Sequence, residues 1–270
     1  AGRASRAAFD EVDRLERRLS RFIENSDVSR INALAAGEDA VVDEDTLRCL
    51  EVAQQAYRLT NGAFDVTIGN IIAAWKYKDI QMAQSLLKNH PGMDMIAIDP
   101  DEFSVKMNGD NVTLDLGGIG KGYAVDVIAA TLRKWGIDKA LIHAGASSIC
   151  ALNPPAEKNG WPVTLTNPID QEKILQLNMK NEVLSCSGLQ AGQHIINPFT
   201  GKPVHGRKAC WVRMKENAAL ADALTTAGMI MPAKRFHSLR DALPDLSVMV
   251  LMTPEAQTPE LIKLGQWPAE

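Results

Sequence analysis

A glycine-rich segment with one lysine is the first part of the chain whose residue types could do chemistry. Residues 114–126 read Leu-Asp-Leu-Gly-Gly-Ile-Gly-Lys-Gly-Tyr-Ala-Val-Asp. The pattern predicts a strand, a tight turn and the start of a helix with Lys121 at its mouth. Backbone N–H groups at a helix start, together with an ammonium group, suit a phosphate or a diphosphate.

Two familiar phosphate-binding motifs do not fit this segment. A Walker loop needs glycine where Asp115 stands and Ser or Thr where Gly122 stands. The Gly-x-Gly-x-x-Gly fingerprint is missed by one residue. A plain strand-to-helix turn therefore explains the glycines about as well as a phosphate site does.

Two further segments could act on a hydroxyl group or hold a cation. His194 precedes Ile195 and Ile196, which lead into an Asn-Pro-Phe-Thr-Gly turn. Asp222 and Thr226 are four residues apart on a predicted helix, so their oxygen atoms share one face and could hold a hard cation. Taken alone, simpler interpretations are preferred: a hydrogen-bonded structural histidine, an Asp near a helix N-terminus, and a Thr bonded to its own backbone.

The elements that must position these residues mix helices with short strands. Apolar residues three and four positions apart predict a long opening helix with the stripe Phe9, Val12, Leu15, Leu19 and Phe22. A second helix is predicted from about Asp45 to Asn61-Gly62. Alternating residues on both sides of an Asn-Gly-Asp-Asn turn predict a β-hairpin over Glu102 to Leu116.

The rest of the chain continues this mixture without the regular βαβ alternation of a Rossmann fold. Further helices are predicted at Gly122–Trp135, Ala218–Met231 and Ala233–Leu243, and strands at Ala140–His143, Val163–Thr166, Val183–Cys186, Ala209–Met214 and Leu246–Met252. Residues 153–160 are predicted to form a surface loop, and no internal repeat or long linker is present.

Composition narrows the classes of function. The chain has 270 residues, of which 46% are hydrophobic and 23% charged, so it is predicted to be globular and not disordered. Its net charge of -4 argues against a dedicated nucleic-acid binder. No apolar run approaches the roughly 20 residues that span a bilayer. The four cysteines, Cys49, Cys150, Cys186 and Cys210, form no Cys-x-x-Cys pair and are expected to lie in the core as free thiols.

In their order along the chain, these segments resemble the ApbE family of FAD:protein FMN transferases. The resemblance begins at residues 19–32, with Leu-Ser-Arg-Phe and Ser-Asp-Val-Ser-Arg-Ile-Asn, and continues through Gly-Ala-Phe-Asp-Val-Thr-Ile-Gly at 62–69. The glycine-rich segment, the turn after His194 and the helix with Asp222 complete it, so it covers about residues 9–252. It implies an α+β fold: a single T-fold-related domain over residues 1–270, with mixed helices and antiparallel strands and without the family's first strand.

The resemblance also implies an activity. Family members split FAD with Mg²⁺, attach FMN through its phosphate to a Thr or Ser hydroxyl of another protein, and release AMP. Some members instead hydrolyse FAD to FMN and AMP. By this resemblance FAD is the substrate, Mg²⁺ the cofactor, and an acceptor protein with a Thr or Ser site the partner.

The same resemblance assigns roles to eleven positions. His194 matches the position best placed to assist the hydroxyl nucleophile. The implied FAD contacts are Phe22, Ala63, Phe64, Asp65, Asp115, Lys121 and Ile196, of which Phe22 and Ile196 lie against the flavin. The implied metal ligands are the main-chain carbonyl of Gly118 and the side chains of Asp222 and Thr226.

Three departures from the family pattern leave alternatives open. Residues 144–148 replace a Gly-Gly pair followed by an acidic or amide residue, Asn197 replaces Asp, and the 189–193 loop is short. None of them removes an implied metal ligand, Lys121 or His194, so an active transferase is predicted. The alternatives are an FAD pyrophosphatase that uses water in the same site, and a non-catalytic FAD-binding protein.

The start of the sequence and the resemblance to the family give expectations about where the protein is located. The sequence begins at Ala1 without Met, so a signal peptide, a lipid-attachment segment or a first strand is expected to have preceded it. The resemblance implies a periplasmic or other extracytoplasmic location, with lipoprotein tethering as one form of it.

Overall fold

The structure is a computed structural model that describes residues 2–145, 147–168, 170–189, 192, 194–253 and 260–268. Its helices are α1 (Gly2–Leu19), α2 (Asp27–Asn32), α3 (Glu44–Thr60), α4 (Gly69–Lys76), α5 (Ile80–Lys88), a 3₁₀ turn (Gly92–Met95), α6 (Gly120–Lys134), α7 (Ala218–Gly228) and α8 (Arg235–Ala242). Its strands are β1 (Asp39–Val41), β2 (Ile96–Asp99), β3 (Ser104–Met107), β4 (Leu141–Ala144), β5 (Ser148–Ala151), β6 (Trp161–Thr166), β7 (Lys173–Met179), β8 (Glu182–Gly188), β9 (Ile196–Asn197), β10 (Lys202–Pro203), β11 (Arg207–Met214), β12 (Ser247–Met252) and β13 (Glu260–Leu264). The predicted α+β class is confirmed.

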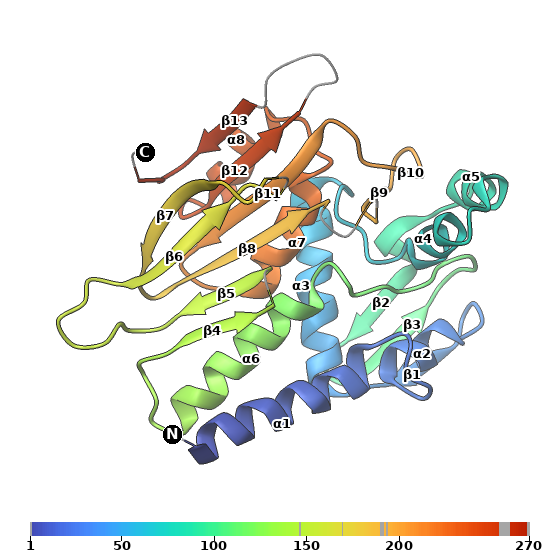
Figure 1. Cartoon of the computed structure of the whole chain (residues 1–270). Helices are drawn as coiled ribbons and strands as arrows, with labels where there is room; N and C mark the ends of the chain where they lie inside the picture. The colour runs from blue at the N-terminus through green and yellow to red at the C-terminus, as the bar shows by residue number, and fades with distance from the viewer. Residues whose placement is uncertain are drawn as a thin grey trace.

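A six-stranded sheet in the order β13-β12-β11-β8-β5-β4 forms the centre of the molecule (Figure 1), and all of its pairings are antiparallel. Helices α6 and α7 pack on one face of this sheet. The β6–β7 hairpin covers the other face, where its apolar residues join those of the sheet in a second core. Smaller sheets, β1-β3-β2 and β9-β10, lie outside it.

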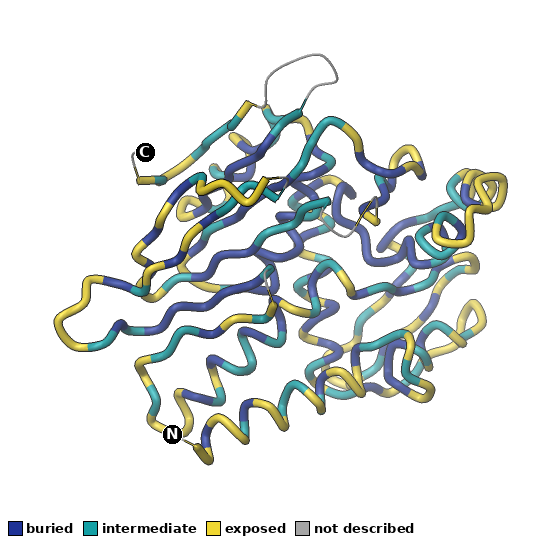
Figure 2. The backbone as a smooth tube through the Cα atoms, viewed as in Figure 1, coloured by how far each residue is buried: buried dark blue, intermediate teal, exposed yellow. Residues whose placement is uncertain are grey.

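The alternation of side chains along the strands separates these two cores. On β11, Cys210 and Val212 face the core that α7 shares, whereas Ala209 and Trp211 face the β6–β7 hairpin. Successive side chains of a strand point to opposite sides of the sheet. Because each side of this sheet is covered, the residues on both sides are apolar. Figure 2 shows this burial through the central strands.

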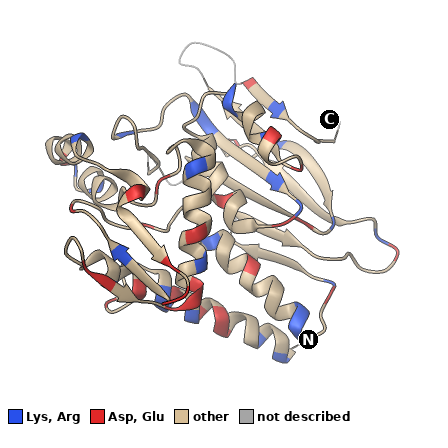
Figure 3. Ribbon diagram, turned by 180° about the vertical axis from the view of Figure 1, so that it is seen from behind, with Lys and Arg blue, Asp and Glu red and all other residues tan. Residues whose placement is uncertain are grey.

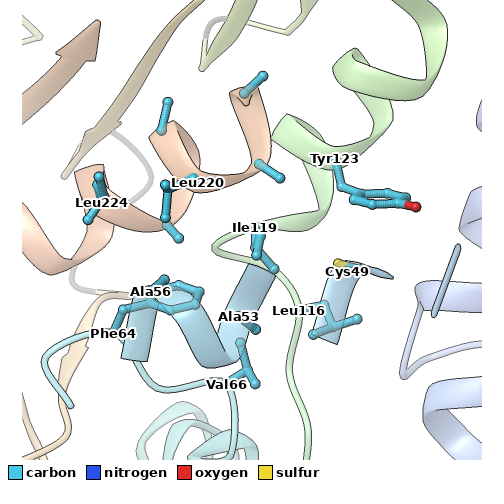
Figure 4. Packing of buried hydrophobic residues seen from close by; sticks show 14 of the residues in the cluster. Cys49, Ala53, Ala56, Phe64, Val66, Leu116, Ile119, Tyr123, Leu220 and Leu224 are labelled. Carbon is cyan, nitrogen blue, oxygen red and sulfur yellow. The ribbon is translucent and has the colours of Figure 1, made fainter. Parts of the chain in front are cut away.

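Helix α7 carries two of the predicted site residues through the middle of the protein. Ten of its eleven residues are buried, and many of them are alanine, so neighbouring elements can approach closely. A Cβ atom at Gly122 of α6 would lie 2.1 Å from the Ala218 carbonyl oxygen, which leaves room only for glycine. The Asp126 carboxylate of α6 accepts the N–H groups of Ala218 and Ala219, both at 2.9 Å, and so fixes the start of α7. Figure 4 shows Leu220 and Leu224 of α7 packed with residues of α3 and of the glycine-rich turn.

Ion pairs tie α1 to the start of α3. Arg14 pairs with Asp43 and Asp45, and the Tyr123 hydroxyl of α6 donates to Asp45 at 2.6 Å. Figure 3 shows the acidic and basic residues gathered in this region. None of the described helices is long and apolar enough to span a bilayer. All four cysteines are free thiols, and Cys49, Cys150 and Cys210 are buried as predicted, whereas Cys186 is only partly buried.

The predicted stripe of the opening helix is wrong at its two ends. Phe9 is 70% exposed, and Phe22 is 76% exposed and lies beyond the end of α1 at Leu19. The buried face instead carries Ala4, Ala8, Leu15 and Leu19. Alanine on this face allows α1 to lie close against α6, and close contact favours small residues over large ones.

The predicted hairpin over residues 102–116 does not form. Strand β3 pairs with β1 and β2, while residues 112–116 run beside the 66–69 segment, with Thr113 bridged to Ile68. The Asn32 side chain bonds the N–H and the carbonyl of Leu114, at 2.6 and 3.1 Å, and holds this segment extended. The strand predicted at Leu246–Met252, β12, is not the edge of the six-stranded sheet, because β13 pairs with it.

The other predicted helices and strands are confirmed within a few residues. Helix α3 ends as predicted, with Asn61 in the left-handed conformation. Helices α4 and α5 were not predicted, because each is short and its apolar residues cover only one or two turns.

Candidate active site

A cavity of about 860 Å³ opens where the α4 region, the glycine-rich turn, α7 and the β6–β8 strands meet. All eleven residues assigned from the sequence line it: Phe22, Ala63, Phe64, Asp65, Asp115, Gly118, Lys121, His194, Ile196, Asp222 and Thr226. They come from five separate stretches of the chain, so their convergence is a result of the fold. Their individual roles stay predictions.

One end of the cavity has an apolar wall. The buried side chains of Ala63, Phe64, Ile68 and Ile196 line it there. Phe22 stands at the rim, with the Arg21 guanidinium 4.9 Å and the Lys76 ammonium 5.8 Å from its ring centroid. An exposed aromatic ring at an apolar wall suits a large planar ligand.

Arg21 lines the cavity and bonds residues of two neighbouring segments. It was not assigned a role from the sequence. Its Nε lies 3.2 Å from Oδ2 of Asp115, and its Nη1 donates to the Gly69 carbonyl at 2.9 Å. A Cβ atom at Gly69 would lie 2.9 Å from that Nη1 and 2.6 Å from the Thr113 carbonyl oxygen, so glycine is needed there. The other oxygen of Asp115 accepts the N–H of Gly117 at 2.8 Å. Asp115 therefore links Arg21 to the glycine-rich turn.

Fewer backbone N–H groups at the start of α6 are available to bind a phosphate than the sequence predicted. The N–H of Gly120 already donates to the Leu116 carbonyl at 2.8 Å, and that of Gly122 donates to Asp222 at 3.0 Å. Lys121 is exposed, and its ammonium donates to the Gly117 carbonyl at 3.2 Å. An ammonium group has three N–H donors, so Lys121 can still bind a phosphate in the cavity.

Asp222 places a buried carboxylate in the middle of the cavity wall. The residue is 2% exposed. Burial raises the pKa of Asp222 to about 6, although the charge of Lys121 and the bond from the Gly122 N–H lower it. A buried carboxylate with so little compensating charge favours a cation beside it.

A chain of hydroxyl groups orients Thr226. The Thr225 hydroxyl donates its one proton to the Asp222 carbonyl at 2.7 Å, so the Ser187 hydroxyl, 2.7 Å away, must donate to Thr225. Ser187 can then only accept from Thr226, whose Oγ1 is 3.3 Å away. The lone pairs of Thr226 are thus left for a ligand. Ser187 was not assigned from the sequence, and only its contacts with α7 reveal it.

The predicted metal ligands fit Mg²⁺ by their chemistry. Asp222 and Thr226 carry oxygen atoms, and Gly118 lies against Thr226, since a Cβ there would be 3.2 Å from Thr226 Oγ1. Mg²⁺ prefers oxygen ligands and usually takes few carboxylates, completing its shell with substrate phosphate and water. The described residues contain no cluster of three or more His, Cys, Asp or Glu side chains suited to a metal. By this preference, a Mg²⁺ ion here would take part of its shell from the phosphate of the substrate.

His194 lies exposed at the edge of the cavity. Its Nδ1 is 2.9 Å from the Gly192 carbonyl oxygen, which can only accept, so Nδ1 carries a proton. In the neutral ring this leaves Nε2 as a proton acceptor. Residues 190, 191 and 193 of the short loop, and Ala146 of the 144–148 departure, lie outside the described residues.

Comparison with known sequences gives one consistent family. The family model of the ApbE family matches residues 2–250. A relative from Vibrio cholerae named FAD:protein FMN transferase is 26% identical over 273 residues, which span 92% of this chain and 80% of the relative. A relative of the same name from Buchnera aphidicola is 24% identical over 273 residues, which span 92% of this chain and 78% of the relative.

Solved structures share the fold. The flavin transferase ApbE from Vibrio cholerae matches with a TM-score of 0.84 at 21% identity, covering 97% of this chain and 88% of that one. The ApbE protein from Thermotoga maritima matches with a TM-score of 0.83 at 25% identity, covering 95% and 88%. The mixed helices and antiparallel sheets found here are therefore those of a known fold.

Proposed function

Because the chain belongs to the ApbE family, we propose that it is an FAD:protein FMN transferase. It takes FAD as substrate, transfers FMN to a Thr or Ser hydroxyl of an acceptor protein and releases AMP, with Mg²⁺ as cofactor. The names of the relatives support the flavin transfer.

One observation supports this function above the others. Residues from five distant stretches, assigned by the family's motifs, converge on one cavity. The cavity joins an apolar wall at Phe22 and Ile196 to a polar centre at Lys121, Asp222 and Thr226. This order suits a molecule that carries a planar ring and a diphosphate, as FAD does.

The polar centre places groups where charge develops when the diphosphate is split. The Lys121 ammonium meets the phosphate oxygens, and the Arg21–Asp115 pair holds the glycine-rich turn on which Lys121 stands. Gly118, Asp222 and Thr226 would hold the cation. When bound there, Mg²⁺ supplies positive charge that offsets the charge growing on the leaving AMP.

His194 supplies the base that the acceptor needs. A Thr or Ser hydroxyl is a weak nucleophile at neutral pH, and a well-placed base raises its rate by roughly 10²–10⁴-fold. Nε2 of His194 is the proton acceptor, and its exposed position allows a protein substrate to reach it. Attack of the hydroxyl oxygen on the FMN phosphorus forms the new ester bond and breaks the bond to AMP, while the proton passes to His194.

The test is incubation of the purified protein with FAD and Mg²⁺, with and without a candidate acceptor, followed by mass spectrometry. We expect an acceptor whose mass rises by one FMN less water, together with one AMP per transfer. Asp222→Asn serves as the control that should not turn over at low Mg²⁺. Steady release of FMN and AMP without acceptor would replace the proposal by the pyrophosphatase, and binding of FAD without turnover would replace it by a flavin-binding protein.

A further inference from the structure

A second histidine, His90, lies buried behind the cavity wall and contacts Asp65. Its Nε2 is 3.0 Å from Oδ2 of Asp65, and the two side chains are 7% and 3% exposed. His90 follows α5, whereas Asp65 lies in the loop after α3, so the contact joins two elements. Asp65 is among the residues that line the cavity and His90 is not.

The hydrogen bonds around Asp65 fix its carboxylate in one orientation. Oδ1 accepts the N–H of Thr67 at 2.8 Å and the Thr67 hydroxyl at 2.5 Å. Oδ2 is bonded to His90 and to neither group of Thr67. The carboxylate is therefore held at both oxygens before any ligand binds.

The surroundings of His90 decide where its proton lies. Its Nδ1 is buried and has no hydrogen-bond partner among the residues that the structure describes. A proton placed on Nδ1 would be a buried unpaired donor, whereas a proton on Nε2 is bonded to Asp65. The Thr67 hydroxyl, 3.1 Å from Nε2, already donates its proton to Asp65, so it does not compete as a donor to the ring. His90 thus acts as a hydrogen-bond donor to Asp65.

The charge of Asp65 restricts which part of the ligand can lie beside it. A carboxylate repels a diphosphate, so the group next to Asp65 must be a neutral donor, such as an N–H or O–H. Ala63 and Phe64, which precede Asp65 in the chain, and Ile196 are buried apolar residues that line the same cavity, so water competes little for such a bond there. Of the residues that line this cavity, Ile196 and Phe22 are predicted to lie against the flavin, and Asp65 belongs to a predicted FAD contact.

We propose that His90 is a positioning residue: it aims the Asp65 carboxylate so that the remaining lone pair of Oδ2 accepts a hydrogen bond from the flavin portion of the substrate. This inference rests on the proposed function for the identity of the ligand. Without His90, Oδ2 loses its fixed donor and the carboxylate can turn from the cavity. The loss falls on flavin binding, and the adenosine and diphosphate portions keep their contacts.

The experiment compares His90→Leu, His90→Gln and Asp65→Asn with wild type for binding of FAD, FMN and ADP. For His90→Leu and Asp65→Asn we expect FMN and FAD affinities to fall about 10-fold and ADP affinity to stay within about 2-fold. His90→Gln should recover most of the loss, because an amide N–H can reach the carboxylate. His237→Gln, on the exposed face of α8, is the matched control and should leave all three affinities unchanged.

A merely structural role gives a different pattern. If removal of His90 loosens the 63–67 segment, Phe64 moves against Gly118 and ADP affinity falls with FMN affinity. A parallel loss of ADP and FMN affinity overturns the inference. It is also overturned if FMN affinity is unchanged in His90→Leu, or if the wild-type protein does not bind FMN. Urea unfolding of each variant shows whether it folds, and Asp65→Asn keeps the test decisive if His90→Leu does not. Turnover of the wild type with an acceptor tests the proposed function separately, so either can fail alone.

Discussion

Replacement of Asp222 by Asn should stabilise the metal-free protein at neutral pH while removing the charge that a cation needs. Burial raises the pKa of Asp222 from 3.8 to about 6, so ionisation of this group is costly in the folded state. One pKa unit corresponds to about 1.4 kcal/mol, which gives a cost of about 3 kcal/mol. Asn keeps the shape of the side chain and an oxygen that can accept the N–H of Gly122.

The difference between the two proteins should depend on pH in a defined direction. Below about pH 4 the carboxyl group is protonated in both the folded and the unfolded chain, so wild type and Asp222→Asn should differ little. Between about pH 4 and 6 the unfolded chain releases the proton while the folded protein keeps it, so wild-type stability falls as the pH rises. Above about pH 6 the folded carboxyl is also ionised, and the loss reaches its full value of about 3 kcal/mol.

The assay is urea unfolding of both proteins in EDTA at several pH values from about 4 to 8. The free energy of unfolding of Asp222→Asn minus that of wild type should rise from near zero to about 3 kcal/mol. A difference that does not change with pH, or an Asn variant less stable than wild type at neutral pH, would refute the reasoning. Addition of Mg²⁺ with FAD should then stabilise wild type and not Asp222→Asn, and high Mg²⁺ or Mn²⁺ should restore only part of the variant's turnover.

Four further expectations follow from the same geometry. His194→Ala should slow transfer by roughly 10²–10⁴-fold and leave FAD affinity nearly unchanged, and an equal loss of binding and rate would make His194 a flavin contact instead. Thr226→Val should reduce turnover less than Asp222→Asn does, measured as initial rate against Mg²⁺ concentration, because water can replace a lost hydroxyl. Gly122→Ala should lower the free energy of unfolding by about 3 kcal/mol in urea, since its Cβ would meet the Ala218 carbonyl, and a soluble variant of unchanged stability would contradict that packing. FAD should bind more tightly than FMN or riboflavin in fluorescence quenching, and equal affinities would show that the adenosine half makes no contact.

Part of the arrangement of the site could be predicted because its signals are local, whereas the roles of its residues rest on the resemblance to the family. Asp222 and Thr226 share a helix face by their spacing alone, and the structure places both on α7 beside the cavity. The glycine-rich turn and the start of α6 were likewise predicted from adjacent residues. Short-range geometry of this kind depends little on the rest of the fold.

The errors occurred where distant parts of the chain decide the outcome. Residues 112–116 alternate as a strand should, yet they run beside residues 66–69 and bond the Asn32 side chain in place of β3. Phe9 has the spacing of a core residue, but it is 70% exposed, and the face of α1 that is buried carries Ala4 and Ala8 in that half of the helix. Periodicity indicates that a segment is regular, whereas its partner is set by tertiary contacts.

The partners of the predicted site residues could not be read from the sequence for a related reason. Three predicted residues each depend on one that was not predicted: Asp115 on Arg21, Thr226 on Ser187, and Asp65 on His90. A buried carboxylate or hydroxyl needs a hydrogen-bonding partner, but any Arg, Ser or His within reach satisfies that need. The chemistry of the ligand restricts which residue types can contact it. The residues that position those contacts are restricted only by the fold. Substitution of these partners should therefore change how well the site is organised before it changes what the site can bind.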